Sequence, residues 1–278
     1  MILSTPLPAL SPGAGLWLVL LTVALYLLAA APFEQLRRFS ALALVGGWVL
    51  HGVLLVVDIA GVGLVGSGAR LGFAPVLSMT VWLVIAVYAI ESRFVPLPAV
   101  RKWLALAGMV ALLVCAAYPG EVRPMTSALA PLHFALGVGA YALFGAAVLH
   151  ALMLDASERR LRGGLSLAAA PASGASMGMP LLRLERLTFR FVEAGFVVLT
   201  ATLLLGFATT VQWRWNDHKA VFSMMAWAVF AALLIGRYQR GWRGRRATRW
   251  LYAGAVLLLF AYVGSRFVLE VLLGRPAL

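Results

Sequence analysis

The chain has little acidic charge. Of its 278 residues only 10 are Asp or Glu, against 23 Lys or Arg, and charged residues make up 12% of the total. Hydrophobic residues make up 63%, and the mean hydropathy of +0.94 is far too high for a soluble domain of this length. The composition therefore predicts an integral membrane protein.

The formal charge of +13 does not make nucleic acid a partner. Nucleic-acid binding needs a basic face on a folded surface, whereas these basic residues lie in short runs between apolar segments. Membrane topology explains the same residues, so we exclude nucleic acid.

Cysteine is almost absent, because Cys115 is the single thiol and lies inside an apolar segment. One thiol forms neither an internal disulfide nor a CxxC redox pair, which excludes a thiol-relay mechanism and leaves Cys115 a packing role. The sequence also shows no nucleophile paired with a base, no metal-ligand cluster and no nucleotide-binding loop. We therefore expect a protein that is not an enzyme.

Long apolar runs dominate what is present. A hydrocarbon core of about 30 Å is crossed by about 20 helical residues. Counting runs of that length predicts an all-α polytopic membrane protein with eight transmembrane helices, at 13–32, 40–60, 75–91, 103–118, 129–154, 188–211, 220–236 and 250–272. The first run has no Lys or Arg before it and two after it, so we expect an uncleaved helix and not a signal peptide.

The basic residues predict one orientation. Seventeen of the 23 fall in alternate loops or at the helix edges beside them, including a cluster of six arginines between 237 and 249. Lys and Arg are retained on the cytoplasmic side, so both termini are predicted to be periplasmic.

One connection, 155–187, is long and rich in Gly, Ala, Ser and Pro. Such a mixture cannot bury a core of its own and indicates a flexible cytoplasmic linker. It divides a five-helix membrane half, 1–154, from a three-helix half, 188–278, and the two together form one membrane domain. No internal repeat relates them, so an inverted-repeat transporter has no direct support.

Two histidines lie at membrane depth, where ionisable residues are costly and are functional candidates. His51 shares one face of its predicted helix with Gly47 and Asp58, and His133 shares a face with Gly137. Small residues beside a histidine admit either a second backbone or a flat ligand, and a planar macrocycle takes axial nitrogens from opposite sides. The alternative is that each histidine hydrogen-bonds a neighbouring helix.

Two further features have alternative interpretations. The turn WRWNDHK, with Trp213, Trp215 and Asp217, is either a helix cap within an interfacial aromatic belt or the edge of a porphyrin site. In the last run, Arg266 and Glu270 stand one turn apart and either neutralise each other or leave Arg266 to bind a propionate.

Several of these segments together resemble the cytochrome c assembly family, in its HemX-like branch related to the CcsA and CcmC proteins. They are WRWNDHKAVFSMMAWAVFAALLIGRYQRGWRGRRATRW, PLLRLERLTFRFVEAGFVVLTATLLLGF, APLHFALGVGAYALFGAAVLHALML and WVLHGVLL. The resemblance spans nearly the whole chain. It implies a bacterial inner (cytoplasmic) membrane protein that handles haem for c-type apocytochromes at the outer face.

The resemblance also implies site residues. His51 and His133 match the family's haem-ligating histidines, and the turn from Trp213 to Lys219 stands in place of its tryptophan-rich WWD loop. His218 stands where the family usually has proline, and the last span has no second outer histidine. The partners that the resemblance implies for this protein are the lipid bilayer, haem, and an apocytochrome or other cytochrome c maturation proteins.

Our hypothesis is a haem-binding, haem-handling membrane protein that assists cytochrome c-type biogenesis, with His51 and His133 ligating iron, Trp213, Trp215 and Asp217 shaping the outer edge, and Arg266 meeting a propionate. One alternative is a small ion-coupled transporter that uses buried charges, namely Asp58, Glu193, Arg266 and Glu270. Another is a non-haem scaffold subunit that recruits partners through its basic loops.

Overall fold

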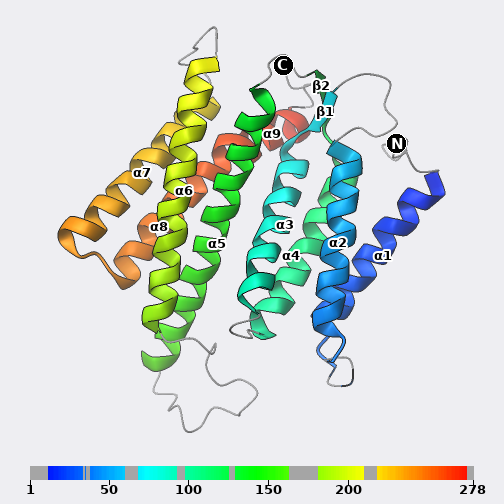
Figure 1. Cartoon of the computed structure of the whole chain (residues 1–278), viewed down its shortest axis with the longest axis horizontal. Coiled ribbons are helices and arrows are strands. Elements are labelled where there is room, and N and C mark those ends of the chain that lie inside the picture. The colour runs from blue at the N-terminus through cyan, green and yellow to red at the C-terminus, as the bar shows by residue number, and fades with distance from the viewer. Residues whose placement is uncertain are drawn as a thin grey trace. The chain divides into compact units, whose positions relative to one another are not determined.

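The computed structural model describes residues 12–33, 35, 38–59, 68–92, 98–124, 129–162, 181–209 and 218–273. Within these ranges nearly all of the chain is helical (Figure 1). Contacts between Cα atoms divide it into two units, which we describe separately. Unit 1 comprises Met1–Pro131 and Arg266–Leu278, and unit 2 comprises Leu132–Ser265.

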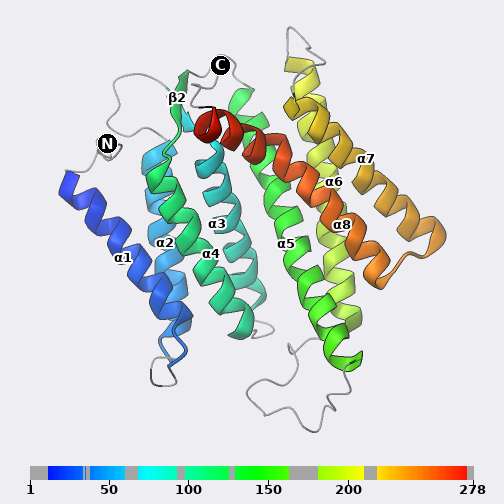
Figure 2. The ribbon, with the colours of Figure 1, turned by 180° about the vertical axis from the view of Figure 1, so that it is seen from behind.

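Unit 1 is built from four apolar helices that lie side by side in both ribbon views (Figures 1 and 2). They are α1 (Pro12–Ala30), α2 (Ser40–Ile59), α3 (Phe73–Glu91) and α4 (Pro98–Ala117). The buried face of α2 includes Gly47, His51, Leu54, Leu55 and Asp58, as its helical periodicity predicts. The sequence therefore placed this face correctly.

A small sheet in unit 1 was not expected from an all-α reading. Strand β1 (Gly68–Leu71) pairs antiparallel with β2 (Glu121–Pro124), and the register sets Arg70 opposite Val122. Gly120 precedes β2 with φ +77°, and a Cβ there would lie 2.8 Å from the Leu71 carbonyl oxygen. The close backbone approach therefore requires glycine.

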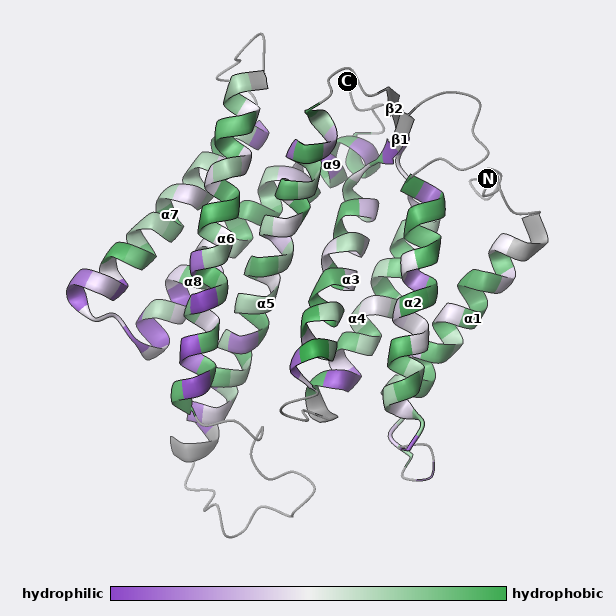
Figure 3. Cartoon of the chain, in the orientation of Figure 1, coloured by the Kyte–Doolittle hydropathy of each residue, from purple (hydrophilic) through white to green (hydrophobic). Residues whose placement is uncertain are grey.

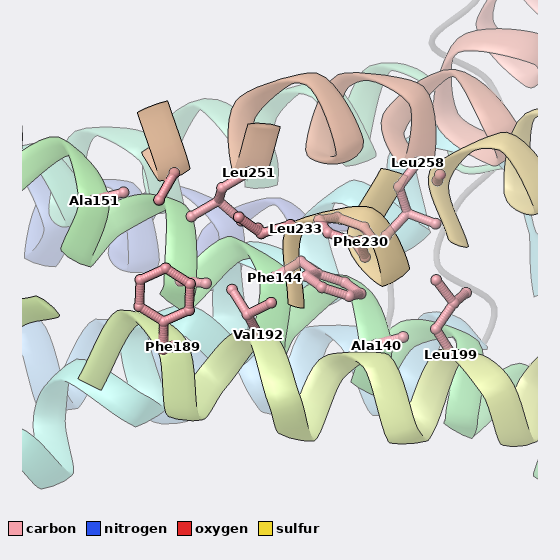
Figure 4. Close-up of a cluster of buried hydrophobic side chains, with 13 residues drawn as sticks. Ala140, Phe144, Ala151, Phe189, Val192, Leu199, Phe230, Leu233, Leu251 and Leu258 are labelled. Atoms are coloured by element: carbon pink, nitrogen blue, oxygen red, sulfur yellow. The ribbon is translucent and has the colours of Figure 1, made fainter. Parts of the chain in front are cut away.

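Unit 2 is built around α5 (Ala130–Arg162), α6 (Leu181–Thr209), α7 (His218–Arg240) and α8 (Gly244–Leu259). Phe144 of α5 stacks on Phe230 of α7, with centroids 3.8 Å apart and planes 7° apart (Figure 4). Around them lie buried side chains from all four helices, which are Ala140, Ala147, Ala151, Phe189, Val192, Leu199, Ala226, Leu233, Ala247, Leu251 and Leu258. Gly195 and Gly254 leave room for the two rings, because a Cβ there would lie 3.1 Å from Phe144 and 2.6 Å from Phe230 respectively.

The turn between α7 and α8 is tight. Gly241 and Gly244 adopt φ values of +63° and +54°, a region that costs other residues free energy. The ring of Trp242 fills the space that a Cβ at Gly236 would occupy, and its backbone N–H donates to the Gly236 carbonyl at 3.1 Å. The turn is thus anchored onto the end of α7.

The last helix changes its winding. After α8 come the π-helical turn η2 (Phe260–Gly264), the short α9 (Ser265–Phe267) and a second π-helical turn, η3 (Val268–Leu272). The boundary between the two units falls between Ser265 and Arg266, within α9.

Seven helical segments are long and apolar enough to cross a membrane, and a shorter apolar helix, Gly15–Ala30, precedes them. Figure 3 shows hydrophobic residues along most of each segment. The protein is therefore a polytopic helical membrane protein, while the eighth span and the periplasmic termini stay predictions.

Helices α5 and α6 extend into the range predicted as a linker, to Arg162 and from Leu181 respectively. Residues 163–180 of that predicted linker lie outside the described residues. The division into a five-helix half, 1–154, and a three-helix half, 188–278, therefore stays a prediction.

Candidate functional site

His51 lies in the core of unit 1 and is completely buried. Its Nδ1 is 3.0 Å from the Tyr26 hydroxyl of α1, and its Nε2 is 2.7 Å from the Ser78 hydroxyl of α3. In a neutral imidazole one ring nitrogen donates and the other accepts, and a hydroxyl can serve either role. His51 therefore joins three helices through a fully satisfied polar group.

The space over the glycines beside His51 is also occupied. A Cβ at Gly47 would lie 3.2 Å from the ring of Tyr26, and one at Gly52 would lie 3.0 Å from the ring of Trp82. The predicted slots are thus filled by aromatic rings from the same unit. Iron ligation by His51 would require Ser78 or Tyr26 to release a ring nitrogen, so the described arrangement does not fit an axial ligand without that change.

A buried ion pair lies near the end of α2. Arg70 of β1 donates to Asp58 at 3.1 Å, and the Cys115 thiol of α4 lies 3.9 Å from the other carboxylate oxygen. Asp58 and Arg70 are each 8% exposed, and Cys115 is buried as expected for a packing residue. Because Asp58 of α2 pairs with Arg70 of β1 and contacts Cys115 of α4, it joins these three elements.

His133 lies in unit 2, in the first turns of α5, and is partly buried. Its ring packs against α6, where a Cβ at Gly206 would lie 2.8 Å from Cε1 and 3.5 Å from Nδ1. The backbone of Thr202 also lies close enough to interact with the ring. Nδ1 itself is buried and has no hydrogen-bond partner among the residues the structure describes.

His133 therefore fits a ligand-binding role better than His51 does. A buried nitrogen without a partner is unfavourable by about 1–3 kcal/mol, and such groups usually have a functional reason. His150, further along α5, differs because its Nδ1 donates to the Ala146 carbonyl at 2.8 Å.

Arg266 is 4% exposed and lies in unit 1. Its Nη1 is 4.0 Å from Glu270, one turn away, and Glu270 approaches Gly72, where a Cβ would lie 3.3 Å from Oε2. The two residues thus form the loose local pair that the spacing allows. A distance of 4.0 Å is long for a charge-assisted hydrogen bond.

Other predicted residues are placed as follows. Trp213, Trp215 and Asp217 lie outside the described residues. Glu193, an acid of the transporter alternative, accepts a hydrogen bond of 2.5 Å from Tyr238. His51 and Arg266 belong to unit 1 and His133 to unit 2, and no cluster of three or more His, Cys, Asp or Glu suited to a metal occurs in the described part of the chain.

The partners of His51 and Asp58 were missed by sequence reasoning. Tyr26, Ser78 and Arg70 are ordinary residues at their positions, and helical periodicity does not say which helices pack together. Only Arg70 could have been noticed from the sequence, because it is one of the few basic residues on the predicted periplasmic side.

Comparison with known proteins decides the family. A family model described as "Cytochrome C assembly protein" matches residues 11–273. The chain belongs to the cytochrome c assembly protein family. The resemblance noted in the sequence is thereby confirmed.

Individual relatives agree with this membership. The Inner membrane protein YpjD of Escherichia coli (strain K12) is 30% identical over 240 residues, covering 85% of this chain and 88% of its own. The Cytochrome c biogenesis protein CcsA of Prochlorococcus marinus (strain MIT 9303) is 34% identical over 87 residues, covering 30% of this chain and 27% of its own. No solved structure matches the chain.

The relative and the apolar helices together place this member of the cytochrome c assembly family in the inner membrane as a multi-pass protein. The localisation predicted from the sequence is confirmed.

Proposed function

We propose that this protein binds haem within the inner membrane and positions it for the assembly of c-type cytochromes, without itself turning over a substrate. The family match over residues 11–273 supports the assembly role. The observation that carries the haem proposal is the buried Nδ1 of His133, which makes no hydrogen bond within the described residues.

His133 is proposed as a ligand on one condition. Gly206 has no side chain, so the ring edge that carries Nδ1 and Cε1 packs against α6, and that edge must turn away from α6 before Nδ1 can bind iron. A neutral imidazole with one unengaged nitrogen is a common iron ligand. Haem, when bound, would supply the iron, and His133 would be the residue that holds it.

His51, in unit 1, is also proposed as a haem ligand, on a condition of its own. The Ser78 hydroxyl, 2.7 Å from Nε2, must turn away before that nitrogen can bind iron. Arg266 is proposed to meet a propionate, and Trp213, Trp215 and Asp217 to line the outer edge. The proposed recipients are an apocytochrome or other maturation proteins, reached from the periplasmic side.

The test is an absorbance spectrum of the purified protein from cells supplied with a haem precursor. We expect a Soret band and split visible bands on reduction in the wild-type protein, and loss of both in His133→Ala. His150→Ala is the matched control, because it removes a buried histidine from the same helix whose Nδ1 already donates to Ala146.

The outcomes separate the functions. A Soret band that survives in His133→Ala contradicts the ligand assignment. A wild-type protein that is well folded but binds no porphyrin contradicts the haem proposal and favours the transporter or the scaffold. Loss of the band in His51→Ala supports ligation by His51 when Ser78→Ala, which disturbs the same network, keeps the band.

A further inference from the structure

Unit 2 carries a strongly basic surface at one end. Eight arginines there are exposed: Arg183, Arg186 and Arg190 of α6, Arg240 and Arg243 at the turn after α7, and Arg245, Arg246 and Arg249 of α8. Figure 3 shows hydrophilic residues on the first turns of α6 and around the turn between α7 and α8. We call these eight residues the arginine surface.

The segments that carry the arginine surface are adjacent in space. Arg237 of α7 forms a hydrogen-bonded ion pair with Glu185 of α6, and Arg243 lies 3.9 Å from the same carboxylate. A small cavity is lined jointly by Glu185 and Thr188 of α6 and by Gly244 and Thr248 of α8. The arginines of α6 and α8 therefore belong to one surface.

Acidic residues do not balance this charge. Residues 181–192 and 237–250 together contain nine arginines and one glutamate, Glu185, which is already held by Arg237. Glu158 of α5 also reaches this end, since its Oε1 lies 3.4 Å from the position of a Cβ at Gly244. With Glu158 counted, the formal charge is +7. Nearby Asp155 of α5 accepts hydrogen bonds from Thr248 at 3.2 Å and Tyr252 at 2.9 Å. The surface therefore presents a large excess of positive charge.

Exposed apolar side chains lie directly beside these arginines. Leu182 is 69% exposed and stands four residues before Arg186, on the same helix face. Trp250 is 36% exposed and stands four residues after Arg246. Ile235, 53% exposed, lies five residues before Arg240 in α7. A partner of this surface must therefore present negative charge next to hydrocarbon.

We propose that the arginine surface binds the headgroups of anionic phospholipids. A phospholipid carries phosphate charge immediately above its acyl chains, so it matches guanidinium groups that adjoin exposed Leu, Ile and Trp side chains. A soluble acidic protein or RNA would match the charge but not the apolar border. The cavity between α6 and α8 encloses about 10 Å³, room for one water, so the acyl chains lie along the outer helix faces.

The variant for the test must spare the arginines that make contacts within the fold. Those are Arg237, which pairs with Glu185, Arg243, which approaches the same carboxylate, and Arg246, whose guanidinium lies 4.2 Å from the centre of the Trp242 ring. Arg240, Arg245 and Arg249 are exposed and lie outside these contacts. The triple variant R240Q/R245Q/R249Q therefore lowers the surface charge by three.

The test is native mass spectrometry of the detergent-solubilised protein with phosphatidylglycerol and phosphatidylcholine of identical acyl chains. We expect the wild-type protein to prefer phosphatidylglycerol, and each arginine removed to weaken that binding about fivefold. The control is R38Q/R101Q/K102Q, which removes three basic residues from unit 1 on the same predicted side of the membrane.

A wild-type protein that binds both lipids equally overturns the proposal, as does a triple variant that keeps the full preference. Equal loss in the unit 1 control also overturns it, because general charge would then explain the binding. Unchanged lipid binding, together with loss of a co-purifying acidic protein from the triple variant, would assign the surface to a protein partner. Selective loss of phosphatidylglycerol binding in R240Q/R245Q/R249Q supports it.

Discussion

His51 shows how a polar side chain is accommodated within a membrane core. A buried polar group without partners is strongly unfavourable, and here both ring nitrogens have a hydroxyl partner, Tyr26 at 3.0 Å and Ser78 at 2.7 Å. The partners come from α1 and α3, so the histidine of α2 specifies which helices meet. Iron ligation through Nε2 would give up the Ser78 contact, so the two roles exclude each other at that nitrogen.

Ser78→Ala tests this network. The change leaves Nε2 of His51 buried without its hydroxyl, and we expect the free energy of unfolding to fall by about 1–3 kcal/mol. Thermal unfolding in detergent measures the effect. Ser92→Ala is the control, because the Ser92 hydroxyl donates only within its own turn, to the Ala89 carbonyl at 3.0 Å. Equal effects of the two substitutions would contradict a special role for the network.

Gly206→Ala tests the contact between α5 and α6 at His133. The new methyl group would lie 2.8 Å from Cε1 of His133, so the ring must move or the helices must separate. We expect a loss of stability of about 1–3 kcal/mol and a weaker Soret band per protein. Gly139→Ala is the matched control, since its nearest neighbour is 3.9 Å away. A full Soret band in Gly206→Ala would count against ligation by His133.

At the scale of elements, an ion pair helps to hold the sheet of unit 1 against the helices. Arg70 of β1 reaches Asp58 near the end of α2, and both side chains are nearly buried. Removing one partner of a buried pair leaves an uncompensated charge, so Arg70→Met should destabilise the protein by about 3–5 kcal/mol. Thermal unfolding of the single variant measures this.

A double variant gives the pair's own control. Asp58→Leu with Arg70→Met removes both charges, and replacement of a buried pair by apolar residues is often neutral. We therefore expect the double variant to recover most of the lost stability. A double variant as unstable as Arg70→Met would show that shape, and not charge, holds β1 in place.

Sequence patterns were informative about helices and silent about this sheet. Apolar runs of about 20 residues gave the long helices to within several residues, because a bilayer selects such runs strongly. Strands of four residues carry no comparable signal, and β1 and β2 are joined only through a pairing of distant segments. The partners of His51 escaped for the same reason: periodicity gives the buried face of one helix and not the identity of its neighbour.

For the whole molecule, composition predicted the membrane class and the quoted motifs predicted the family, and both are confirmed. Neither the pairing of the fifth helix with the last three nor the unit boundary inside α9 could be predicted, because both depend on packing between distant segments. The distribution of Lys and Arg makes a prediction that the helix count does not, namely the side of the membrane on which each loop lies.

Cysteine labelling can test that statement across the whole chain. Cys115 is the single native cysteine and is buried, so Cys115→Ala gives a background into which one new cysteine is placed. In spheroplasts treated with a membrane-impermeant maleimide, we expect Ser4→Cys and Leu278→Cys to be labelled at once. Ser173→Cys, within the predicted cytoplasmic linker, should be labelled only after lysis.

The same experiment distinguishes eight spans from seven. If the first apolar helix does not cross the membrane, the two termini lie on opposite sides, and Ser4→Cys will resist labelling while Leu278→Cys reacts. Reaction at Ser173→Cys in intact spheroplasts would reverse the orientation. It would also move the arginine surface to the outer leaflet, against the retention of Lys and Arg on the cytoplasmic side.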